Sequence, residues 1–551
     1  MKIITQTICL IILILSIHRC FANTYYVSPS GNNSNSGTIN NPWKTINYSQ
    51  NQLVAGDTLF VRNGVYVERV LIGNSGTSSN PISILAYQNE NPIIDGQSTL
   101  PDDDWEGLLT LYGSYLHVSG FEIRNSNITG NVLGGVGILF DGGTHNKVSF
   151  MKIHHIREQG IIVEADNAIV EDCEIYDCAL SNVNLDMSVA WANGISVARE
   201  QTNGITDNAI IRRCIVYNNY GEGIGVFEAN NVIVEDCISY DNWTMNLYLS
   251  DATNCTLQRN ICYNSTNSTF PKRDGEFTGI TIADEISNGT SIPHSSHNTI
   301  INNFLFNANL DAFRWSLIPN IGLDNVLIAN NTVVGNSSGF STGSINDNII
   351  NINSKIINNI LTGSVSVPDA QGLIFSNNSW LNQPPSSASS NGDIIGDPMV
   401  TMIGSTNLGE LTGDYFKLLS DSPCINSGDV LTEVIVDFFK NDRDNLPDIG
   451  GHEFSIPLSI EQNNLYNSLL IYPNPNNGMF SISMNNELFG DLSISLYNNL
   501  GINIFNTIIH KQNFNLTQKI KLNNLMSGIY YLRIITLENK IFSTKLIISN
   551  R

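Results

Sequence analysis

The stretch Ala168-Ile-Val-Glu-Asp-Cys173-Glu-Ile-Tyr176 decides the fold, because the chain repeats it with variation along much of its length. Close copies are Ala209-Ile-Ile-Arg-Arg-Cys214-Ile-Val-Tyr217 and Val232-Ile-Val-Glu-Asp-Cys237-Ile-Ser-Tyr240. Later copies carry Asn260, Asn303, Asn331 and Asn359 in place of the cysteine, and looser ones carry Phe121, Met151 and Asn377. Copies recur at intervals near 22 residues, with occasional longer insertions. Such a period is the signature of a solenoid, and this spacing predicts one coil of a parallel β-helix per copy.

The central position of the repeat forms a column with a physical meaning. Identical residues stacked about 4.8 Å apart can pack or hydrogen-bond from one coil to the next. Asparagine amides bridge neighbouring coils, and buried cysteines behave as small hydrophobic residues. We therefore expect Cys173, Cys214 and Cys237 to form an inert interior ladder. The column resembles the asparagine ladder of pectate-lyase-like right-handed parallel β-helices.

A second strand precedes the repeated phrase in each coil. The aligned segments begin at Gly137, Gly160, Gly194, Gly223, Asn246, Gly279 and Ala312. Their second and fourth residues are always apolar and, because side chains alternate along a strand, are expected to point into the core. The third residue of each segment is expected to face solvent.

The two ends of the chain carry different signals. Residues 1–22 read as a secretory signal, with Lys2 before an apolar stretch. Three C-terminal motifs resemble the type IX secretion sorting domain of Bacteroidetes: Tyr472-Pro-Asn-Pro-Asn-Asn-Gly478, Ser527-Gly-Ile-Tyr-Tyr-Leu-Arg533 and Lys545-Leu-Ile-Ile-Ser-Asn-Arg551. That resemblance implies the type IX machinery as a partner and export through the outer membrane, followed by release or attachment to the cell surface.

These signals together predict an all-β protein: a right-handed, single-stranded parallel β-helix followed by a small C-terminal β-sandwich. The expected parts are a signal peptide (1–22), an N-terminal cap with the first coils (23–100), β-helix repeats (101–392), a trailing segment that closes the solenoid (393–456), a linker (457–467) and the sorting domain (468–551). We expect a monomer.

Composition excludes several classes of function. The chain carries 27 Lys and Arg against 50 Asp and Glu, for a net charge of −23, which argues against nucleic acid or an anionic membrane surface as partner. No segment after residue 22 is long and apolar enough to predict a membrane span. Seven cysteines follow the signal; their pairing is left open, and the absence of a CxxC pair gives no support for a zinc site.

The strand alignment also brings acidic residues together. The sixth residue of successive segments is Arg199, Glu228, Asp251 and Asp284, so three carboxylates are predicted on neighbouring coils about 4.8 Å apart. Like charges this close repel each other. A calcium ion, a shared proton or Arg199 would offset that repulsion. Glu228, Asp251 and Asp284 are therefore the candidate metal ligands and catalytic carboxylates.

Neighbouring residues complete the candidate site. Tyr248 and Arg314 occupy the third position of their segments and are candidate catalytic groups. The candidate substrate-binding residues are Arg199, Asp241, Trp243, Lys272, Arg273 and Glu285. Several of these lie in or beside long insertions, and long loops on a rigid scaffold are where binding functions concentrate.

Three functions remain open, each on an extracellular polysaccharide. The fold resemblance and the acidic column favour a lyase that uses Ca²⁺ and β-elimination, with Lys272, Arg273, Arg314 or Tyr248 as base or acid. The second is a glycoside hydrolase that uses two of the carboxylates. The third is a non-catalytic protein that binds glycan or acts as a cell-surface stalk. The sequence shows no lyase signature around a catalytic Lys or Arg and does not identify the polysaccharide or its linkage.

Overall fold

A computed structural model describes residues 22–549 except 102–105, 129–134, 186–191, 199–203, 274–277, 285–294, 309–310, 317–321, 336–337, 343–350, 367–370, 456–468, 475, 486–489, 499–502, 514, 523–524, 526 and 537–540. The chain forms two compact units, Met1–Phe454 and Ser455–Arg551. The expected signal peptide falls almost entirely outside the described residues, and so does the expected linker.

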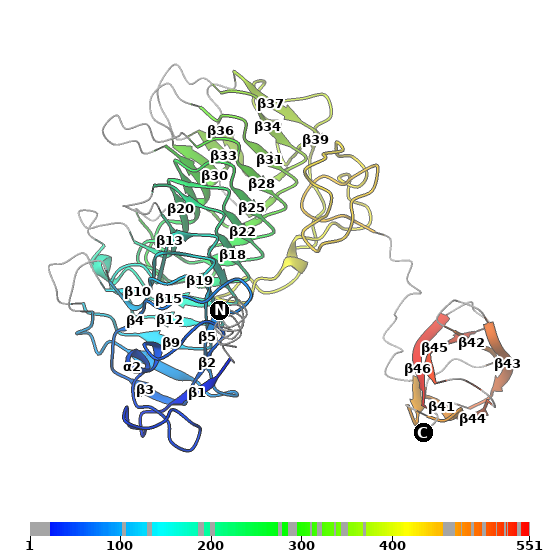
Figure 1. Ribbon diagram of the computed structural model, residues 1–551. Coiled ribbons are helices and arrows are strands. Elements are labelled where there is room, and N and C mark those ends of the chain that lie inside the picture. Colours follow the sequence, from blue (N-terminus) through cyan, green and yellow to red (C-terminus); the bar gives the residue numbers. More distant parts are fainter. Residues whose placement is uncertain are drawn as a thin grey trace, which may run out of the picture. The chain divides into compact units, whose positions relative to one another are not determined.

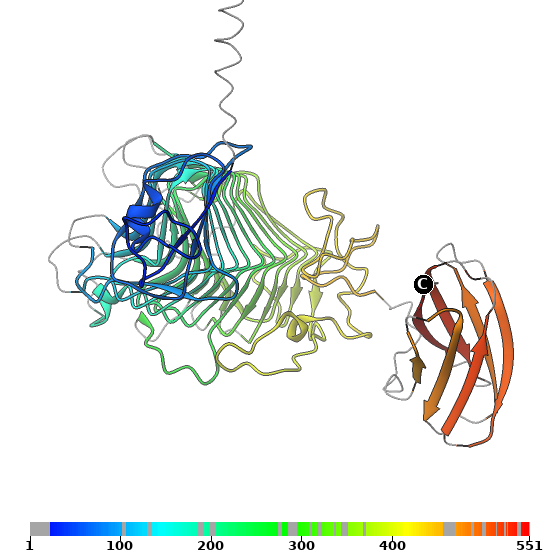
Figure 2. The ribbon, with the colours of Figure 1, turned by 60° about the horizontal axis from the view of Figure 1, so that its bottom comes forward.

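The first unit is a parallel β-helix in which each coil adds one strand to each of three sheets (Figures 1 and 2). Sheet 1 contains β1 (Thr24–Val27), β2 (Thr58–Val61), β5 (Ile82–Ala86), β8 (Leu116–Ser119), β11 (Lys147–Ser149), β14 (Ile169–Glu171), β18 (Ile210–Arg212), β22 (Ile233–Glu235), β25 (Thr256–Gln258), β28 (Thr299–Ile301), β31 (Leu327–Ala329), β34 (Ser354–Ile357) and β37 (Leu373–Ser376). Sheet 2 contains β3 (Gly64–Tyr66), β6 (Pro92–Asp95), β9 (Glu122–Arg124), β12 (Lys152–His154), β15 (Glu174–Tyr176), β19 (Ile215–Tyr217), β23 (Ile238–Tyr240), β26 (Ile261–Tyr263), β29 (Phe304–Phe306), β32 (Thr332–Val334), β35 (Ile360–Leu361), β38 (Ser379–Trp380) and β39 (Ile394–Ile395).

Sheet 3 is formed by the strands that precede the repeated phrase. It contains β4 (Val70–Ile72), β7 (Gly107–Leu111), β10 (Val136–Thr144), β13 (Ile161–Asp166), β16 (Asn193–Val197), β20 (Glu222–Phe227), β24 (Met245–Ser250), β27 (Thr278–Ala283), β30 (Asp311–Ser316), β33 (Ser338–Thr342) and β36 (Ser364–Ser366). A short helix, α2 (Ile46–Gln50), covers the first coils. The two-stranded ribbon of β17 (Thr206–Asp207) and β21 (Ala229–Asn230) and the 3₁₀ turns η1 (Leu180–Asn182) and η3 (Gly413–Phe416) complete the unit.

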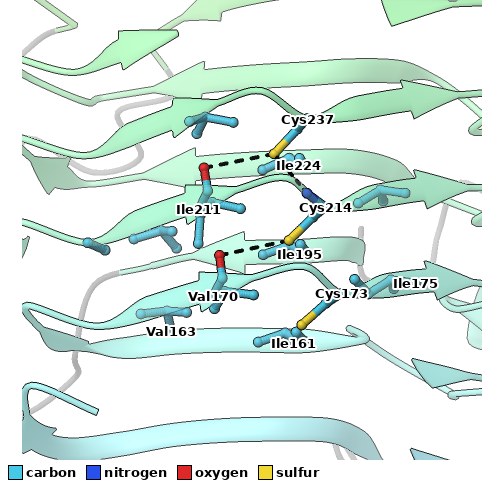
Figure 3. Close-up of a cluster of buried hydrophobic side chains, with 14 of the residues drawn as sticks. Ile161, Val163, Val170, Cys173, Ile175, Ile195, Ile211, Cys214, Ile224 and Cys237 are labelled. Carbon is cyan, nitrogen blue, oxygen red and sulfur yellow. Dashed lines mark hydrogen bonds between the residues drawn. The ribbon is translucent and has the colours of Figure 1, made fainter. Parts of the chain in front are cut away.

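The predicted ladder lies inside the corner between sheets 1 and 2. Cys173, Cys214 and Cys237 are stacked and buried among Ile and Val side chains (Figure 3), and burial raises the pKa of the Cys173 and Cys237 thiols well above its usual range. The asparagines continue the column through hydrogen bonds, as where the Asn303 amide donates to Asn331 Oδ1 at 3.0 Å. The seven cysteines after residue 22 are buried and free.

One position of the ladder was predicted wrongly. Asn378, not Asn377, continues it, because the backbone N–H of Asn359 donates to Asn378 Oδ1 at 2.9 Å. Asn377 has a φ of 49° and is the residue that turns the corner, and such left-handed backbone is most easily adopted by Asn, Asp and Gly. Two adjacent asparagines make the two roles indistinguishable in the sequence.

The trailing segment (residues 393–454) differs from the expected closing cap. Only β39 adds to the end of the solenoid, by pairing with β38. Much of the rest packs against the outer side of sheet 2 (yellow in Figure 2), where Phe304 stacks on Phe416 and Phe438 with ring centroids 4.5 and 4.0 Å apart. Val434 packs on Ile301 and Ala329 of sheet 1. Large aromatic residues on the outer face of sheet 2 would otherwise be exposed, and burying them is the physical reason for this arrangement.

The second unit consists of two antiparallel sheets that form a small β-sandwich. One sheet contains β40 (Leu469–Tyr472), β41 (Met479–Asn485) and β44 (Asn515–Lys521). The other contains β43 (Asn503–Lys511), β42 (Gly490–Tyr497), β45 (Gly528–Ile535) and β46 (Ile541–Ile548). Alternating apolar residues of both sheets, such as Ile482, Ile494 and Leu532, are fully buried between them.

Candidate functional site

The predicted register of sheet 3 is present in the structure. Phe227 pairs with Ser250, Ser250 with Ala283, and Ala283 with Ser316. Glu228, Asp251 and Asp284 each follow directly, so they leave sheet 3 on successive coils at its carboxyl edge. The backbone confirms this order, because Glu228 N–H donates to Ser250 O at 3.0 Å and Asp251 N–H donates to Ala283 O at 3.1 Å.

The acidic column is less open than expected. Asp251 and Asp284 are only 4% and 5% exposed, and Glu228 is half-buried. Asp251 Oδ2 accepts a hydrogen bond from Ser250 Oγ at 3.0 Å, and Asp284 Oδ1 accepts one from the Ser295 backbone N–H at 2.6 Å. These carboxylates therefore take part in shaping the corner that leads from sheet 3 to the next coil.

The expectation that the third position faces solvent is wrong. Ser196, Tyr248 and Thr281 are 3–4% exposed, and the Tyr248 ring packs edge-on against Phe227 at 5.4 Å. Arg314 is half-buried. Alternation along a strand decides which face a side chain takes, but it does not decide what covers that face.

The described residues do not fit the predicted calcium site. No group of three or more His, Cys, Asp or Glu side chains in the described part of the chain is arranged to hold a metal ion. Calcium takes six to eight oxygen ligands, and Glu228, Asp251 and Asp284 do not come together as a group that could begin to supply them. Arg199 and Glu285, which were expected beside this column, lie outside the described residues.

A second group of predicted residues lies at the opposite edge of sheet 3. Asp241 and Trp243 belong to the turn that leads into β24, and the Arg273 backbone N–H donates to Trp243 O at 2.8 Å. The six residues of β24 separate this edge from Asp251, which corresponds to roughly 20 Å at about 3.3 Å per residue. The structure therefore divides the predicted site residues into two separate places.

Lys272 is the residue at this edge with the most unusual environment. Its side chain is 10% exposed; Nζ donates to Asn242 O at 3.0 Å and lies 3.7 Å from Asp241 Oδ1. Burial lowers the pKa of Lys272 to about 8, and the neighbouring Asp241 opposes this shift only in part. A lysine with such a pKa is neutral in about a tenth of the molecules at pH 7, far more than an ordinary lysine, and can act as a general base.

A hollow of about 290 Å³ lies beside Lys272, and we call it the corner hollow. It is lined by Asn218, Tyr220, residues 267–271 and Leu408. The rings of Tyr220 and Phe270 contact each other at 4.9 Å, and Lys272 Nζ lies 5.7 Å from the centre of the Phe270 ring. The sequence predicts none of these lining residues, although Lys272 and Arg273, which follow them directly, are among the candidates in or beside long insertions.

The trailing segment supplies part of this wall. Leu408 N–H donates to Asn267 Oδ1 at 2.9 Å, and Thr266 N–H donates to Thr406 O at 3.0 Å. Three stretches that are far apart in the sequence thus meet at one corner of the β-helix.

Of the helices in the described part of the chain, none has the length and apolar character that a membrane crossing requires.

Two regions of the chain match known families. Residues 25–256 match the Pel9A-like right-handed β-helix region, and residues 470–549 match the secretion system C-terminal sorting domain. Among solved structures, XylC in complex with xylose has a TM-score of 0.52 at 12% identity, over 78% of this chain and 98% of that chain. The pectate lyase Pel9A has a TM-score of 0.48 at 16% identity, over 79% and 96%.

Curated relatives match shorter stretches. Protein YwoF of Bacillus subtilis (strain 168) is 31% identical over 26% of this chain and 30% of its own length. Pectate lyase PEL9 of Emericella nidulans is 25% identical over 37% of this chain and 49% of its own length. Pectate lyase L of Paenibacillus polymyxa is 26% identical over 25% and 30%. The chain thus spans between 30% and 49% of the length of these relatives.

The two regions describe the chain in complementary ways. The coils make up the β-helix. The C-terminal unit is a sorting domain, which directs the protein to the outside of the cell or to its surface. The chain is therefore a right-handed parallel β-helix protein with Pel9A-like N-terminal coils and a type IX secretion sorting domain at its C-terminus.

Proposed function

We propose that this protein cleaves an acidic extracellular polysaccharide by β-elimination, with Lys272 as the proton acceptor. The observation that carries the proposal is the buried Lys272 ammonium, whose pKa burial lowers to about 8, beside an aromatic hollow. The curated relatives named pectate lyases support the reaction class. The aromatic side chains of the corner hollow support a sugar as ligand.

The chemistry assigned to Lys272 is one proton transfer. Its neutral amine takes the proton from the carbon that bears the uronate carboxylate, the electron pair of that C–H bond forms a C=C bond, and the neighbouring C–O bond breaks. The leaving oxygen takes a proton from water. Arg273, next in sequence and half-buried, is proposed to bind the substrate carboxylate, because an arginine pairs with a carboxylate through two parallel hydrogen bonds.

This assignment predicts a pH dependence. Only the neutral amine of Lys272 accepts a proton, so the turnover rate is expected to rise about tenfold per pH unit below about 8 and to level off above it. The measurement is the initial rate of ultraviolet absorbance from the unsaturated product between pH 5 and 10. A rate that falls over this range would contradict Lys272 as the base.

A glycoside hydrolase at the acidic column is the second candidate, favoured by the position of Glu228, Asp251 and Asp284 on successive coils. Coils are spaced about 4.8 Å apart, close to the separation of about 5–5.5 Å between the two carboxyl groups of retaining glycosidases.

The hydrolase candidate is tested by Asp251→Asn, which keeps the size of the side chain and its hydrogen bond from Ser250. If a hydrolase is at work, this variant is expected to lower the release of reducing ends by about 100-fold or more, with no ultraviolet-absorbing product from either protein. For the lyase, Asp251→Asn is expected to change the rate by less than about twofold, because Asp251 lies roughly 20 Å from the Lys272 edge.

Calcium assistance is tested independently of these variants. Activity is measured after chelation and again after Ca²⁺ is added back. A loss that only Ca²⁺ restores would place a metal ion in the reaction despite the poor fit of Glu228, Asp251 and Asp284. Affinity for glycan without release of any product would instead support the non-catalytic binding protein.

A further inference from the structure

We infer that the corner hollow binds a neutral sugar ring, so that the substrate contains both uronates and neutral sugars. The inference rests on the proposed function, because it takes the uronate to be the sugar cleaved beside Lys272. The proposed function names a reaction, and this inference adds the class of substrate, a polysaccharide that contains both uronates and neutral sugars.

The lining of the hollow is uncharged. Asn218, Tyr220, Leu408 and residues 267–271 contain amide, hydroxyl, aromatic and aliphatic side chains but no formal charge at pH 7. Lys272 follows directly in sequence, but its ammonium donates to Asn242 O and faces Asp241. A uronate in the hollow would lose hydration without gaining a cation, which is costly, whereas a neutral ring meets no such penalty.

The hollow also offers the contacts that a neutral sugar requires. Asn218 Oδ1 is buried and accepts no hydrogen bond from the described residues, and an unsatisfied buried acceptor costs about 1–3 kcal/mol. A sugar hydroxyl that donates to this oxygen would remove that cost. The Tyr220 and Phe270 rings supply apolar surface for the C–H groups of the sugar.

The wall of the hollow is held in place by the protein itself. Asn267, one of the lining residues, is held by the trailing segment, because its Oδ1 accepts a hydrogen bond from the Leu408 N–H at 2.9 Å. Thr266 is tied to Thr406 by the backbone bond described above. Because the insertion and the trailing segment brace each other, the hollow exists before any ligand binds.

The test is binding without turnover, measured by calorimetry on full-length protein carrying Lys272→Met. Three probes of equal length are compared: a homo-oligouronate, an oligosaccharide that alternates uronate with neutral sugar, and a fully neutral oligosaccharide. We expect the alternating probe to bind most tightly. Tyr220→Ala, and separately Asn218→Gly, should weaken its binding about tenfold or more, which corresponds to about 1.4 kcal/mol, and should leave the homo-oligouronate unaffected.

Asn218→Gly is suited to this test because Asn218 has a φ of 52°, which glycine adopts without strain. Equal or tighter binding of the homo-oligouronate would overturn the inference, and so would an equal loss for all three probes in both variants. Failure of the proposed function is recognised separately, because it would appear as cleavage activity retained in Lys272→Met.

Discussion

Replacing Lys272 by methionine is expected to lower the rate of ultraviolet-absorbing product release by about 100- to 10,000-fold, the range that a general base contributes. Methionine matches the apolar part of the lysine side chain but lacks the amine that accepts a proton. The loss should appear in kcat more than in KM, because the chemical step is removed and most binding contacts remain.

Two further variants make this result specific. Lys272→Arg keeps a cation near Asp241, but arginine does not deprotonate near neutral pH, so it should be as inactive as Lys272→Met. The matched control is Lys355→Met on β34, a half-buried lysine of sheet 1, which should retain full activity. Activity retained in Lys272→Arg would contradict the assignment of Lys272 as the base. Thermal unfolding of each variant checks that the β-helix is intact.

The fold could be predicted because the same contact recurs from coil to coil and is made each time by the same type of residue. In the later coils an interior amide both donates and accepts along the solenoid, and Asn303, Asn331 and Asn359 recur for that reason. The register of sheet 3 followed in the same way, since one apolar pair per coil fixes which residues stack.

The candidate site was only partly predictable, because burial and long-range packing leave no periodic signal. Tyr248 occupies a position that the alternation of side chains places outside the core, yet it is covered, and Asp251, which follows the same strand, is covered as well. The corner hollow combines Tyr220, Phe270 and Leu408, and no local pattern links residues so far apart. Lys272 was identified as a candidate from its insertion, but its burial against Asp241 depends on the three-dimensional packing.

The largest expected effect on stability comes from the interior ladder, through Asn331→Ala. Asn331 Oδ1 accepts from both the backbone N–H and the amide of Asn303, at 2.8 and 3.0 Å. Its own amide donates to Ile300 O and Asn359 Oδ1, at 2.9 Å each. Alanine leaves the backbone N–H of Asn303 without its partner and removes one of the two bonds made by the Asn303 amide, which still donates to Leu257 O. Asn359 Oδ1 keeps the bond from the Asn331 backbone N–H, and each buried group left unsatisfied costs about 1–3 kcal/mol. The free energy of unfolding is therefore expected to fall by about 3–6 kcal/mol, as measured by urea unfolding of the full-length protein.

The matched control is Asn230→Ala, which removes a comparable set of hydrogen bonds from a half-buried position outside the interior of the solenoid. Asn230 donates to Asp207 at 2.8 Å and accepts from Thr253 and Asn254, at 3.0 and 2.8 Å, but water can reach these groups once the side chain is gone. We expect a loss below about 1 kcal/mol, because solvent replaces each bond. Equal losses in the two variants would show that burial of the ladder contributes nothing beyond the hydrogen bonds themselves, contrary to the argument that the asparagine column holds the coils in register.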